Sequence, residues 1–488
     1  MTSIPVKPAR ADSEATVVAA ETSAVSDETT VVAAASGAAR VARPTGGTGA
    51  QPPAAAPELI ADLEPKALDA RGQAAQDELR ALVDPGSYIR VEGRAGLAAH
   101  SGRGTAQGRA VVLYGIEGGH PGGAIGPEEA ETILAAADDA RRSEVPLISV
   151  NVLLEPRPGS GLDGMIAVHQ IASASARLSQ MIPQIAVVTD PAAGATAGLS
   201  LTADLIVLGG AHAPTAGDAA HVLTADAPAA FDQARRLARL LPSTPGALRD
   251  ALAFSGDGGD RVLPPALCAQ LTGAAPIDVR ALIDAICDAG SFVELEGHRG
   301  RGLITGLAAI FGQTVGLTAS QPGERTGLDR AALEKATELI ALCERYSIPL
   351  INLIDAGVEP TEVITRLANP ATPPAPLIRS SVALTRARQA VAPSVTLILR
   401  RASGLDLFTW ASRPHHAVIA YPGAELSPDG PGSAAKAFER GLLQKIVPPE
   451  QTVPELVHWT RWSRAERARV TLRLRPNDPL LYNLKLPR

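Results

Sequence analysis

The chain has 488 residues, and its 45 Lys and Arg against 51 Asp and Glu give a formal net charge of −6. This acidic balance argues against binding of nucleic acid or of anionic membranes through bulk charge. At roughly 100–200 residues per domain, the length allows about two to four domains. A hydrophobic content of 45% is enough to build more than one core.

Cysteines and apolar runs exclude several further classes. Cys268, Cys287 and Cys343 are spaced in a way that matches no zinc motif, and their scarcity argues against a disulfide framework. No run of about 18 apolar residues is free of charges and turn residues, which argues against a membrane span. Acidic residues follow Lys7 and Arg10 where a signal peptide would have an apolar core. We therefore expect a cytoplasmic protein without a metal.

The first stretch of the chain differs in composition from the rest. Residues 1–57 consist mainly of Ala, Thr, Val, Gly and Pro, and the first aromatic residue of the chain is Tyr88. Without large apolar groups to offset the entropy of ordering, residues 1–57 are predicted to form a disordered tail, either a flexible leader or a docking arm. Leucines recur among charged residues from Pro57 to Val83, which predicts one or two amphipathic helices.

Four blocks of sequence occur twice in the same order. Gly290 lies 204 positions after Gly86 within the first matching pair, and the later pairs are offset by 204, 203 and 210 positions. The paired blocks are Leu82–Gly93 with Ile286–Gly297, Gly108–Leu113 with Gly312–Leu317, Val145–Val150 with Ile348–Leu353, and Pro183–Val188 with Pro393–Ile398. Repetition in the same order at a nearly constant offset indicates a duplicated domain.

Each repeat alternates apolar runs with a helical segment. The helices are predicted at Pro127–Arg142 and at Asp329–Tyr346, and the apolar runs do not alternate with polar residues. This pattern is typical of buried parallel strands in an α/β unit. Gly and Pro interrupt the periodicity between the repeats. We therefore predict a first domain at 58–245, a linker at 246–275 and a second domain at 276–488.

Glycine turns are the strongest candidates for chemistry. The chain has no G-x-S-x-G and no P-loop lysine motif, and its histidines are more simply explained as structural residues. Glycine-rich turns instead follow the predicted strands, at 118–126, 193–195, 356–357 and 403–404. Such turns can present backbone N–H groups at helix N-termini to an oxyanion such as a developing enolate. Each turn alone is more often a packing feature, but they recur at equivalent points of the two repeats.

Taken together, these motifs resemble a known family over about residues 80–470. The first repeat contributes Asp84–Tyr88, Gly102–Thr105, Gly122–Gly126 and Leu240–Pro242, and the second contributes Asp288–Phe292, Ser320–Pro322, Gly327–Asp329, Ile348–Ile351 and Tyr421–Glu425. They resemble the carboxyltransferase β subunit of biotin-dependent acyl-CoA carboxylases, of the propionyl-CoA carboxylase type, in the crotonase-like superfamily. The resemblance implies an α/β fold made of two tandem crotonase-like domains, each a ββα spiral.

The resemblance also implies a reaction and its partners. Carboxybiotin, carried on a separate protein, would give CO2 to the α-carbon of an acyl-CoA through an enolate held in backbone oxyanion holes. Gly194 and Ala195 would be the oxyanion donors of the first domain, while Gly357 and Gly404 would face biotin. The turn that faces CoA would comprise Gly122, Gly123 and Ala124. The partners implied are a biotin carboxylase or biotin carrier subunit and further subunits in a hexamer-like ring, with no metal.

Several glycine motifs depart from the family pattern. Val152–Arg157 stands where the family has Asp-Ser-Gly-Gly-Ala-Arg, which places Leu154 at a glycine position, and Leu405-Asp406 follows Gly404 where the family has Gly-Ala. Glu155 and Asp406 are either solvated loop acids or signs of altered chemistry. Two alternatives therefore stay open: a catalytically degenerate structural or regulatory subunit that assembles with an active paralogue, and an acyl-CoA decarboxylase or a related crotonase-like thioester enzyme.

Overall fold

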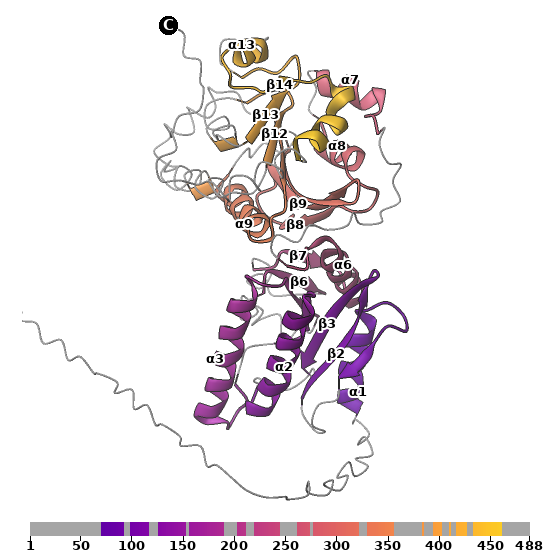
Figure 1. Ribbon diagram of the computed structural model, residues 1–488, viewed down its shortest axis with the longest axis vertical. Coiled ribbons are helices and arrows are strands. Elements are labelled where there is room, and N and C mark those ends of the chain that lie inside the picture. The colour runs from indigo at the N-terminus through magenta and orange to yellow at the C-terminus, as the bar shows by residue number, and fades with distance from the viewer. Residues whose placement is uncertain are drawn as a thin grey trace, which may run out of the picture. The chain divides into compact units, whose positions relative to one another are not determined.

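The computed structural model (Figure 1) provides the structure of most of the chain. It describes residues 70–91, 98–116, 125–152, 156–189, 203–210, 219–244, 261–273, 277–321, 329–355, 383–384, 394–402, 409–410, 416–426 and 433–460. All of these belong to one compact unit, Glu64–Arg488. The predicted tail at 1–57 lies outside the described residues.

The first half of the described chain forms a seven-stranded sheet with its strands in chain order, β1-β2-β3-β4-β5-β6-β7. Strands β1 to β3 pair antiparallel, and β3 to β7 pair parallel. The strands are β1 (Ile89–Val91), β2 (Ala99–Ala106), β3 (Arg109–Ile116), β4 (Leu147–Val150), β5 (Gln184–Val188), β6 (Leu205–Gly209) and β7 (Val222–Thr224).

The second half repeats this topology. Its seven-stranded sheet has the order β14-β13-β12-β11-β10-β9-β8, again antiparallel at the start and parallel from β10 to β14. The strands are β8 (Val293–Leu295), β9 (Leu303–Ile310), β10 (Gln313–Ser320), β11 (Leu350–Ile354), β12 (Ser394–Ile398), β13 (His416–Ala420) and β14 (Lys445–Ile446). The duplicated α/β fold predicted from the sequence repeats is therefore confirmed.

Two aspartates of the first repeated block have the same structural role in the two halves. The carboxylate of Asp84 accepts hydrogen bonds from the backbone N–H groups of Gln107 and Gly108, at 2.9 and 2.7 Å, in the turn between β2 and β3. Burial favours the neutral acid, but these bonds and one from Thr105 prevail and lower the pKa of Asp84. In the second half, Asp288 accepts equivalent bonds from the 311–312 turn at 3.0 and 2.7 Å. These aspartates hold the hairpins together.

The glycines of β2 and β9 permit close packing. A Cβ atom on Gly102 would lie 2.5 Å from the Tyr88 ring, and one on Gly306 would lie 2.4 Å from the backbone oxygen of Val293. Real Cβ atoms do not approach other atoms so closely, so each strand needs glycine at this point. The Gly102–Thr105 motif, which carries part of the family resemblance, is therefore explained by packing against Tyr88.

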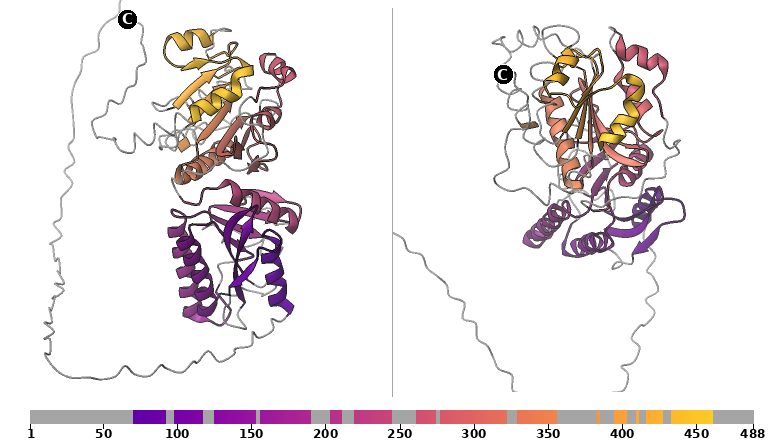
Figure 2. Two further views of the ribbon diagram at one scale, coloured as in Figure 1. Left: turned by 45° about the vertical axis from the view of Figure 1, so that its right-hand side comes forward. Right: turned by 45° about the horizontal axis from the view of Figure 1, so that its top comes forward.

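Helices cover both faces of each sheet, as Figures 1 and 2 show for the first half, where α2 and α3 lie on one side of β2 and β3 and α1 lies on the other. The helices include α1 (Ala70–Ala81), α2 (Pro127–Ser143), α3 (Gly161–Leu178), α6 (Ala227–Leu240), α7 (Pro265–Thr272), α8 (Val279–Ile286), α9 (Arg330–Tyr346) and α13 (Ser433–Glu439), with a 3-10 turn at Pro449–Gln451. Among the described residues, no helix has the length and apolar character needed to cross a bilayer.

The ends of α2 and α9 confirm both predicted helices to within one residue. Helix α2 begins with Pro127 at its first position, and Glu129 closes a capping box on the Gly126 N–H. Asp329 caps the start of helix α9 and accepts a hydrogen bond from the backbone N–H of Ala332 at 2.7 Å. Both helices end at a residue in the left-handed region.

The two halves share one hydrophobic core. Buried side chains from β3, β5 and α6 of the first half belong to the same cluster as side chains from β9, α9 and β13 of the second. A second cluster packs α2 and α3 on the first sheet, and a third packs α7 and α8 on the second sheet. Helix α7 lies inside the stretch predicted as a linker, 246–275, but its Leu267 and Leu271 are buried in the core of the second half.

A buried carboxylate adds a polar contact between the halves. The hydroxyl of Tyr346 at the end of α9 donates to Asp204 just before β6, with 2.7 Å between the oxygens, and Arg345 forms an ion pair with the same carboxylate. The backbone N–H of Gln184 also donates to Asp204, at 2.9 Å. Burial raises the pKa of Asp204, while these hydrogen bonds and Arg345 oppose the rise. The contact ties β5 and β6 to α9.

Candidate functional site

The predicted site residues of the first half follow strands that end at one edge of the sheet. In the register, Gly115 of β3 lies opposite Val150 of β4, and Val150 lies opposite Val187 of β5. The carboxyl ends of these parallel strands therefore meet, which is where open α/β sheets usually bind ligands. The predicted site residues follow β3, β4 and β5 in the sequence. They lie outside the described residues: Gly122, Gly123, Ala124, Leu154, Glu155, Gly194 and Ala195.

Asn151 anchors this edge. It follows β4 directly, is 8% exposed, and has a left-handed backbone with φ +52°. Its side-chain amide nitrogen donates to Glu78 of α1 and to the hydroxyl of Thr189, both at 3.0 Å, and its amide oxygen accepts the Thr189 N–H at 2.7 Å. One side chain therefore joins the ends of β4 and β5 to α1, and Asn tolerates the left-handed backbone better than most residues.

A buried glutamate fixes the start of α2 next to the altered motif. Glu129, 1% exposed at its side chain, accepts the Gly126 N–H at 2.9 Å and forms an ion pair with Arg157. The backbone N–H of Arg157 in turn donates to the carbonyl of Ile125 at 2.9 Å. The segment that ends the altered motif is therefore attached to the N-terminus of α2, where Glu129 also meets the positive end of the helix dipole.

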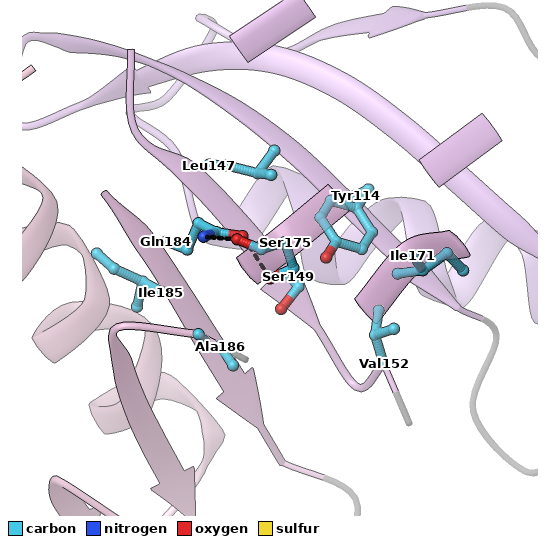
Figure 3. Close-up of a pocket in the computed structure, with 10 residues that line it drawn as sticks. Tyr114, Leu147, Ser149, Val152, Ile171, Ser175, Gln184, Ile185 and Ala186 are labelled. Atoms are coloured by element: carbon cyan, nitrogen blue, oxygen red, sulfur yellow. Dashed lines mark hydrogen bonds between the residues drawn. The ribbon is translucent and has the colours of Figure 1, made fainter. Parts of the chain in front are cut away.

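Val152 faces the interior. It is 6% exposed, packs in the cluster beneath α2 and α3, and lines a cavity of about 20 Å³ (Figure 3). The cavity also contacts Tyr114 and Ser149, while Ser175 donates to Gln184 at its wall at 2.6 Å. Burial raises the pKa of Tyr114 to about 12, and a hydrogen bond with Ser149 opposes the rise. The cavity has room for about one water molecule and none for an acyl chain.

The second sheet presents an equivalent edge. Leu353 of β11 lies opposite Ala319 of β10 and opposite Leu397 of β12 in the register. Chain connections after β11 and β12 carry the two remaining predicted site residues, Gly357 and Gly404. Both lie outside the described residues, as do Leu405 and Asp406.

A buried ion pair anchors this second edge. Asp355 follows β11 and is 2% exposed. Its Oδ2 accepts a hydrogen bond from Nε of Arg400 at 2.7 Å and lies 2.6 Å from Nη2 of the same guanidinium. Burial raises the pKa of Asp355, while the Arg400 guanidinium and the backbone N–H of Arg401 oppose the rise. Arg400 follows β12, so the pair joins the ends of β11 and β12 just before the segments with Gly357 and Gly404.

A more exposed pair extends this anchor to the end of β13. Arg401 Nε donates to Glu425 Oε2 at 3.0 Å, and both side chains are partly exposed. The two segments also exchange backbone bonds: the Glu425 N–H donates to the carbonyl of Arg400 at 2.7 Å, and the Ala402 N–H donates to the carbonyl of Glu425 at 3.0 Å. The predicted family motif around Glu425 is therefore fixed to the motif that follows β12.

The carboxyl transferase domain family matches residues 78–210 and 206–445, and thus both halves. The chain belongs to the carboxyl transferase domain family. The family resemblance predicted from the sequence is confirmed.

Named relatives of this carboxyl transferase chain act on CoA esters. The chain is 27% identical over 399 residues to the propionyl-CoA carboxylase beta chain of Rhodococcus erythropolis, covering 75% of this chain and 81% of that one. It is 28% identical over 400 residues to a biotin-dependent acetyl-/propionyl-coenzyme A carboxylase beta6 subunit of Mycobacterium tuberculosis, covering 75% and 80%. It is also 25% identical over 446 residues to the methylmalonyl-CoA decarboxylase subunit alpha of Veillonella parvula, covering 78% and 85%.

Among solved structures, transcarboxylase 12S with methylmalonyl-coenzyme A bound matches with a TM-score of 0.66. The two sequences are 22% identical, and the match covers 84% of this carboxyl transferase chain and 92% of that one. At 22% identity, the structural match is evidence for the fold alone. It confirms the predicted α/β architecture of two tandem domains.

Sequence reasoning identified the edges of the two sheets but missed the side chains that hold them. Asn151, Thr189 and Glu129 were not candidates, because their partners are far apart in sequence, for example 73 residues between Asn151 and Glu78. One signal was available for Asn151: an Asn directly after a buried strand often adopts a left-handed backbone.

Proposed function

We propose that this chain is the carboxyltransferase subunit of a biotin-dependent acyl-CoA carboxylase, which transfers CO2 from carboxybiotin on a separate carrier to the α-carbon of an acyl-CoA. The observation that carries the proposal is the family match to both halves, each of which has a carboxyl edge held by buried polar side chains. The relatives named for propionyl-CoA carboxylase favour a short acyl-CoA as substrate.

Several backbone N–H groups at the edge of the first sheet already make hydrogen bonds within the protein, which excludes them as donors to an oxyanion. The N–H of Gly126 is bound to Glu129, that of Arg157 to Ile125, and that of Thr189 to Asn151. These groups cannot also stabilise charge on a thioester oxygen. This supports Gly194 and Ala195, five and six positions beyond Thr189, as the donors of the first half.

The same reasoning applies to the second edge. The N–H groups of Arg401, Ala402 and Glu425 are engaged by Asp355, Glu425 and Arg400 respectively. This supports the predicted Gly357 and Gly404, which follow the Asp355–Arg400 pair in the chain, as the donors of the second half. When bound, carboxybiotin supplies the CO2, and the chain's part is to hold the two edges and direct N–H groups at developing negative charge.

Assembly, partners and location are further parts of the proposal. We expect a ring of several subunits that works with a biotin carboxylase and a biotin carrier, in the cytoplasm. The resemblance to carboxylase beta chains supports this arrangement. Gly122, Gly123 and Ala124 are proposed to shape the turn that faces CoA.

The test is a carboxyl-transfer assay on the purified full-length chain. Methylmalonyl-CoA or malonyl-CoA is supplied with free biotin or a biotinylated carrier, and formation of the acyl-CoA is followed. Activity that depends on biotin is expected. Gly194→Leu should remove it, since one lost oxyanion donor typically costs about 10²–10³ in kcat. Gly108→Asn, just before β3 and far from this edge, is the control: no atom lies within 4 Å of a new Cβ there, and Asn tolerates its left-handed backbone with φ +80° better than most other residues.

Each other outcome favours a stated alternative. Loss of CO2 from the CoA ester without biotin would point to a decarboxylase, a function that one relative's name carries. A folded, assembled protein that neither binds the CoA esters in calorimetry nor transfers CO2 would point to a structural subunit beside an active paralogue.

A further inference from the structure

Three titratable side chains meet where the two halves touch. A ring nitrogen of His221, before β7, and carboxylate oxygens of Glu296 and Glu338 all lie within 4.8 Å of one another. Glu296 lies in the turn after β8 and Glu338 lies on α9. The backbone joins the same segments, because the Glu296 N–H donates to the carbonyl of His221 at 2.6 Å.

A His and two Glu could in principle bind a cation, but the hydrogen bonds oppose it. The backbone N–H of Ile206 donates to Nδ1 of His221 at 3.0 Å, so Nδ1 carries no proton and the neutral ring carries its proton on Nε2. A protonated Nε2 is a donor and cannot bind a metal. In addition, the Arg299 guanidinium already bridges the two carboxylates, through an ion pair with Glu296 and a 3.1 Å contact to Glu338.

The carboxylate of Glu296 is the unusual member of the cluster. Its side chain is only 5% exposed, while that of Glu338 is 51% exposed. Glu296 also has a left-handed backbone, with φ +55°. Two carboxylates this close share one guanidinium in a partly buried place, an arrangement in which keeping one proton avoids repulsion between like charges.

The surrounding charges come from each element packed on the cluster. Lys335 of α9, 1% exposed, donates to the carbonyl of Arg299 at 2.9 Å and so fixes the turn that carries Glu296. Burial lowers the pKa of Lys335 to about 8. The other titratable groups near the cluster are His298, Glu294 and Asp329.

We propose that the two halves are joined by a proton-linked contact, in which the buried carboxyl of Glu296 holds a proton next to Glu338, His221 and Arg299. Loss of that proton places two negative charges next to one guanidinium. The resulting repulsion weakens the contact between the turn after β8 and the segment before β7. The contact is thus a pH-sensitive joint, independent of the carboxyl-transfer proposal.

The direction of the pH effect follows from Glu296. Burial raises its pKa to about 7, Glu338 adds to the rise, and Arg299 opposes it. Because the folded protein holds this proton above the ordinary value of 4.5, the contribution is present at low pH and is lost as the pH rises through about 7. His221 acts in the opposite sense: burial lowers its pKa to about 4, so its contribution is lost as the pH falls below about 6.5.

Infrared spectra of the full-length protein test whether Glu296 holds this proton. Wild type at pH 6 should show the carbonyl stretch of a neutral carboxylic acid that disappears at pH 8.5 and is missing from Glu296→Gln. Glu334→Gln is the matched control, since it removes an exposed carboxylate from α9 outside the cluster. Glu338→Gln should lower the pH at which the band disappears. A wild-type spectrum in which no band depends on Glu296 would overturn the proposal.

Two further readouts separate the joint from simple titration. The difference in thermal midpoint between Glu296→Gln and wild type should shift by about 2–4 °C in favour of the variant as the pH is raised from 5 to 8. Amide hydrogen exchange of residues 293–300 is compared between wild type and Glu296→Gln at each pH. Over the same pH range, exchange in wild type should become several-fold faster than in the variant. If the thermal midpoints and exchange rates of the two proteins changed with pH in parallel, the proposed pH-sensitive joint would be refuted. A midpoint raised by Zn²⁺ or Mn²⁺ and lost in His221→Ala would replace it with a metal site.

Discussion

The two halves of the chain hold their neighbouring strand ends together with different kinds of side chain. At the carboxyl edge of the first sheet, a neutral amide, Asn151, joins the ends of two neighbouring strands. At the corresponding edge of the second sheet, a buried ion pair, Asp355 with Arg400, joins them. Asp355 lies 203 positions after Val152, which is the offset of that repeated block, and Val152 is packed in the core.

The comparison shows which parts of a duplicated fold are fixed and which are free to change. The hairpin aspartates, Asp84 and Asp288, bind the same two backbone N–H groups in both halves, because every copy of the hairpin needs its turn closed. The edge anchors differ, because several kinds of side chain can connect two parallel strand ends. Val152 carries no charge and packs in the core, so its position needs no charged partner.

The largest effect is expected from breaking the buried ion pair. Arg400→Met leaves the Asp355 carboxylate buried without its guanidinium, which should lower the unfolding free energy by about 3–5 kcal/mol. Chemical denaturation measures this. The more exposed pair offers a matched control, since Arg401→Met should cost at most about 1 kcal/mol. Equal losses in the two variants would show that burial does not distinguish the pairs.

The first-half anchor should be weaker. Asn151→Ala removes the acceptor of the Thr189 N–H and places Ala in a left-handed backbone, for a loss of about 2–3 kcal/mol by denaturant titration. Asn151→Gly keeps the backbone freedom and loses only the side-chain bonds. The difference between these two variants therefore measures the backbone strain, and identical values would mean that strain contributes nothing.

The smallest expected contrast concerns the glycines of β2 and β9. A methyl group on Gly306 meets a backbone oxygen at 2.4 Å, whereas one on Gly102 meets the Tyr88 ring, which has more room to turn aside. Gly306→Ala should therefore be about 1–2 kcal/mol more destabilising than Gly102→Ala. Thermal unfolding of both variants side by side provides the comparison, and a larger loss at Gly102 would contradict it.

Sequence patterns were sufficient for the fold. Offsets between the repeats predicted the duplication, and unbroken apolar runs such as Val145–Val150 predicted the parallel strands. Helix ends followed local rules, as Pro127 and Asp329 illustrate. The strand and helix signals work because each depends on neighbours within a few residues, and the duplication can be read directly by comparing the sequence with itself.

The anchors at the sheet edges depend on distant partners instead. Nothing near Asp355 in the sequence indicates that Arg400 is its partner, since 45 residues separate them. Similarly, Glu129 has an ordinary position for a helix start, and only the fold brings Arg157 to it. The glycine roles predicted for Gly194, Ala195, Gly357 and Gly404 rest on family likeness and stay predictions.

The core that both halves share has a consequence for how this chain unfolds. Side chains of α6 from the first copy and of α9 from the second are buried in one cluster, so neither copy completes its interior alone. The duplication therefore does not yield two separable folding units. Unfolding of one copy would expose apolar surface on the other, and the two should melt in a single cooperative step.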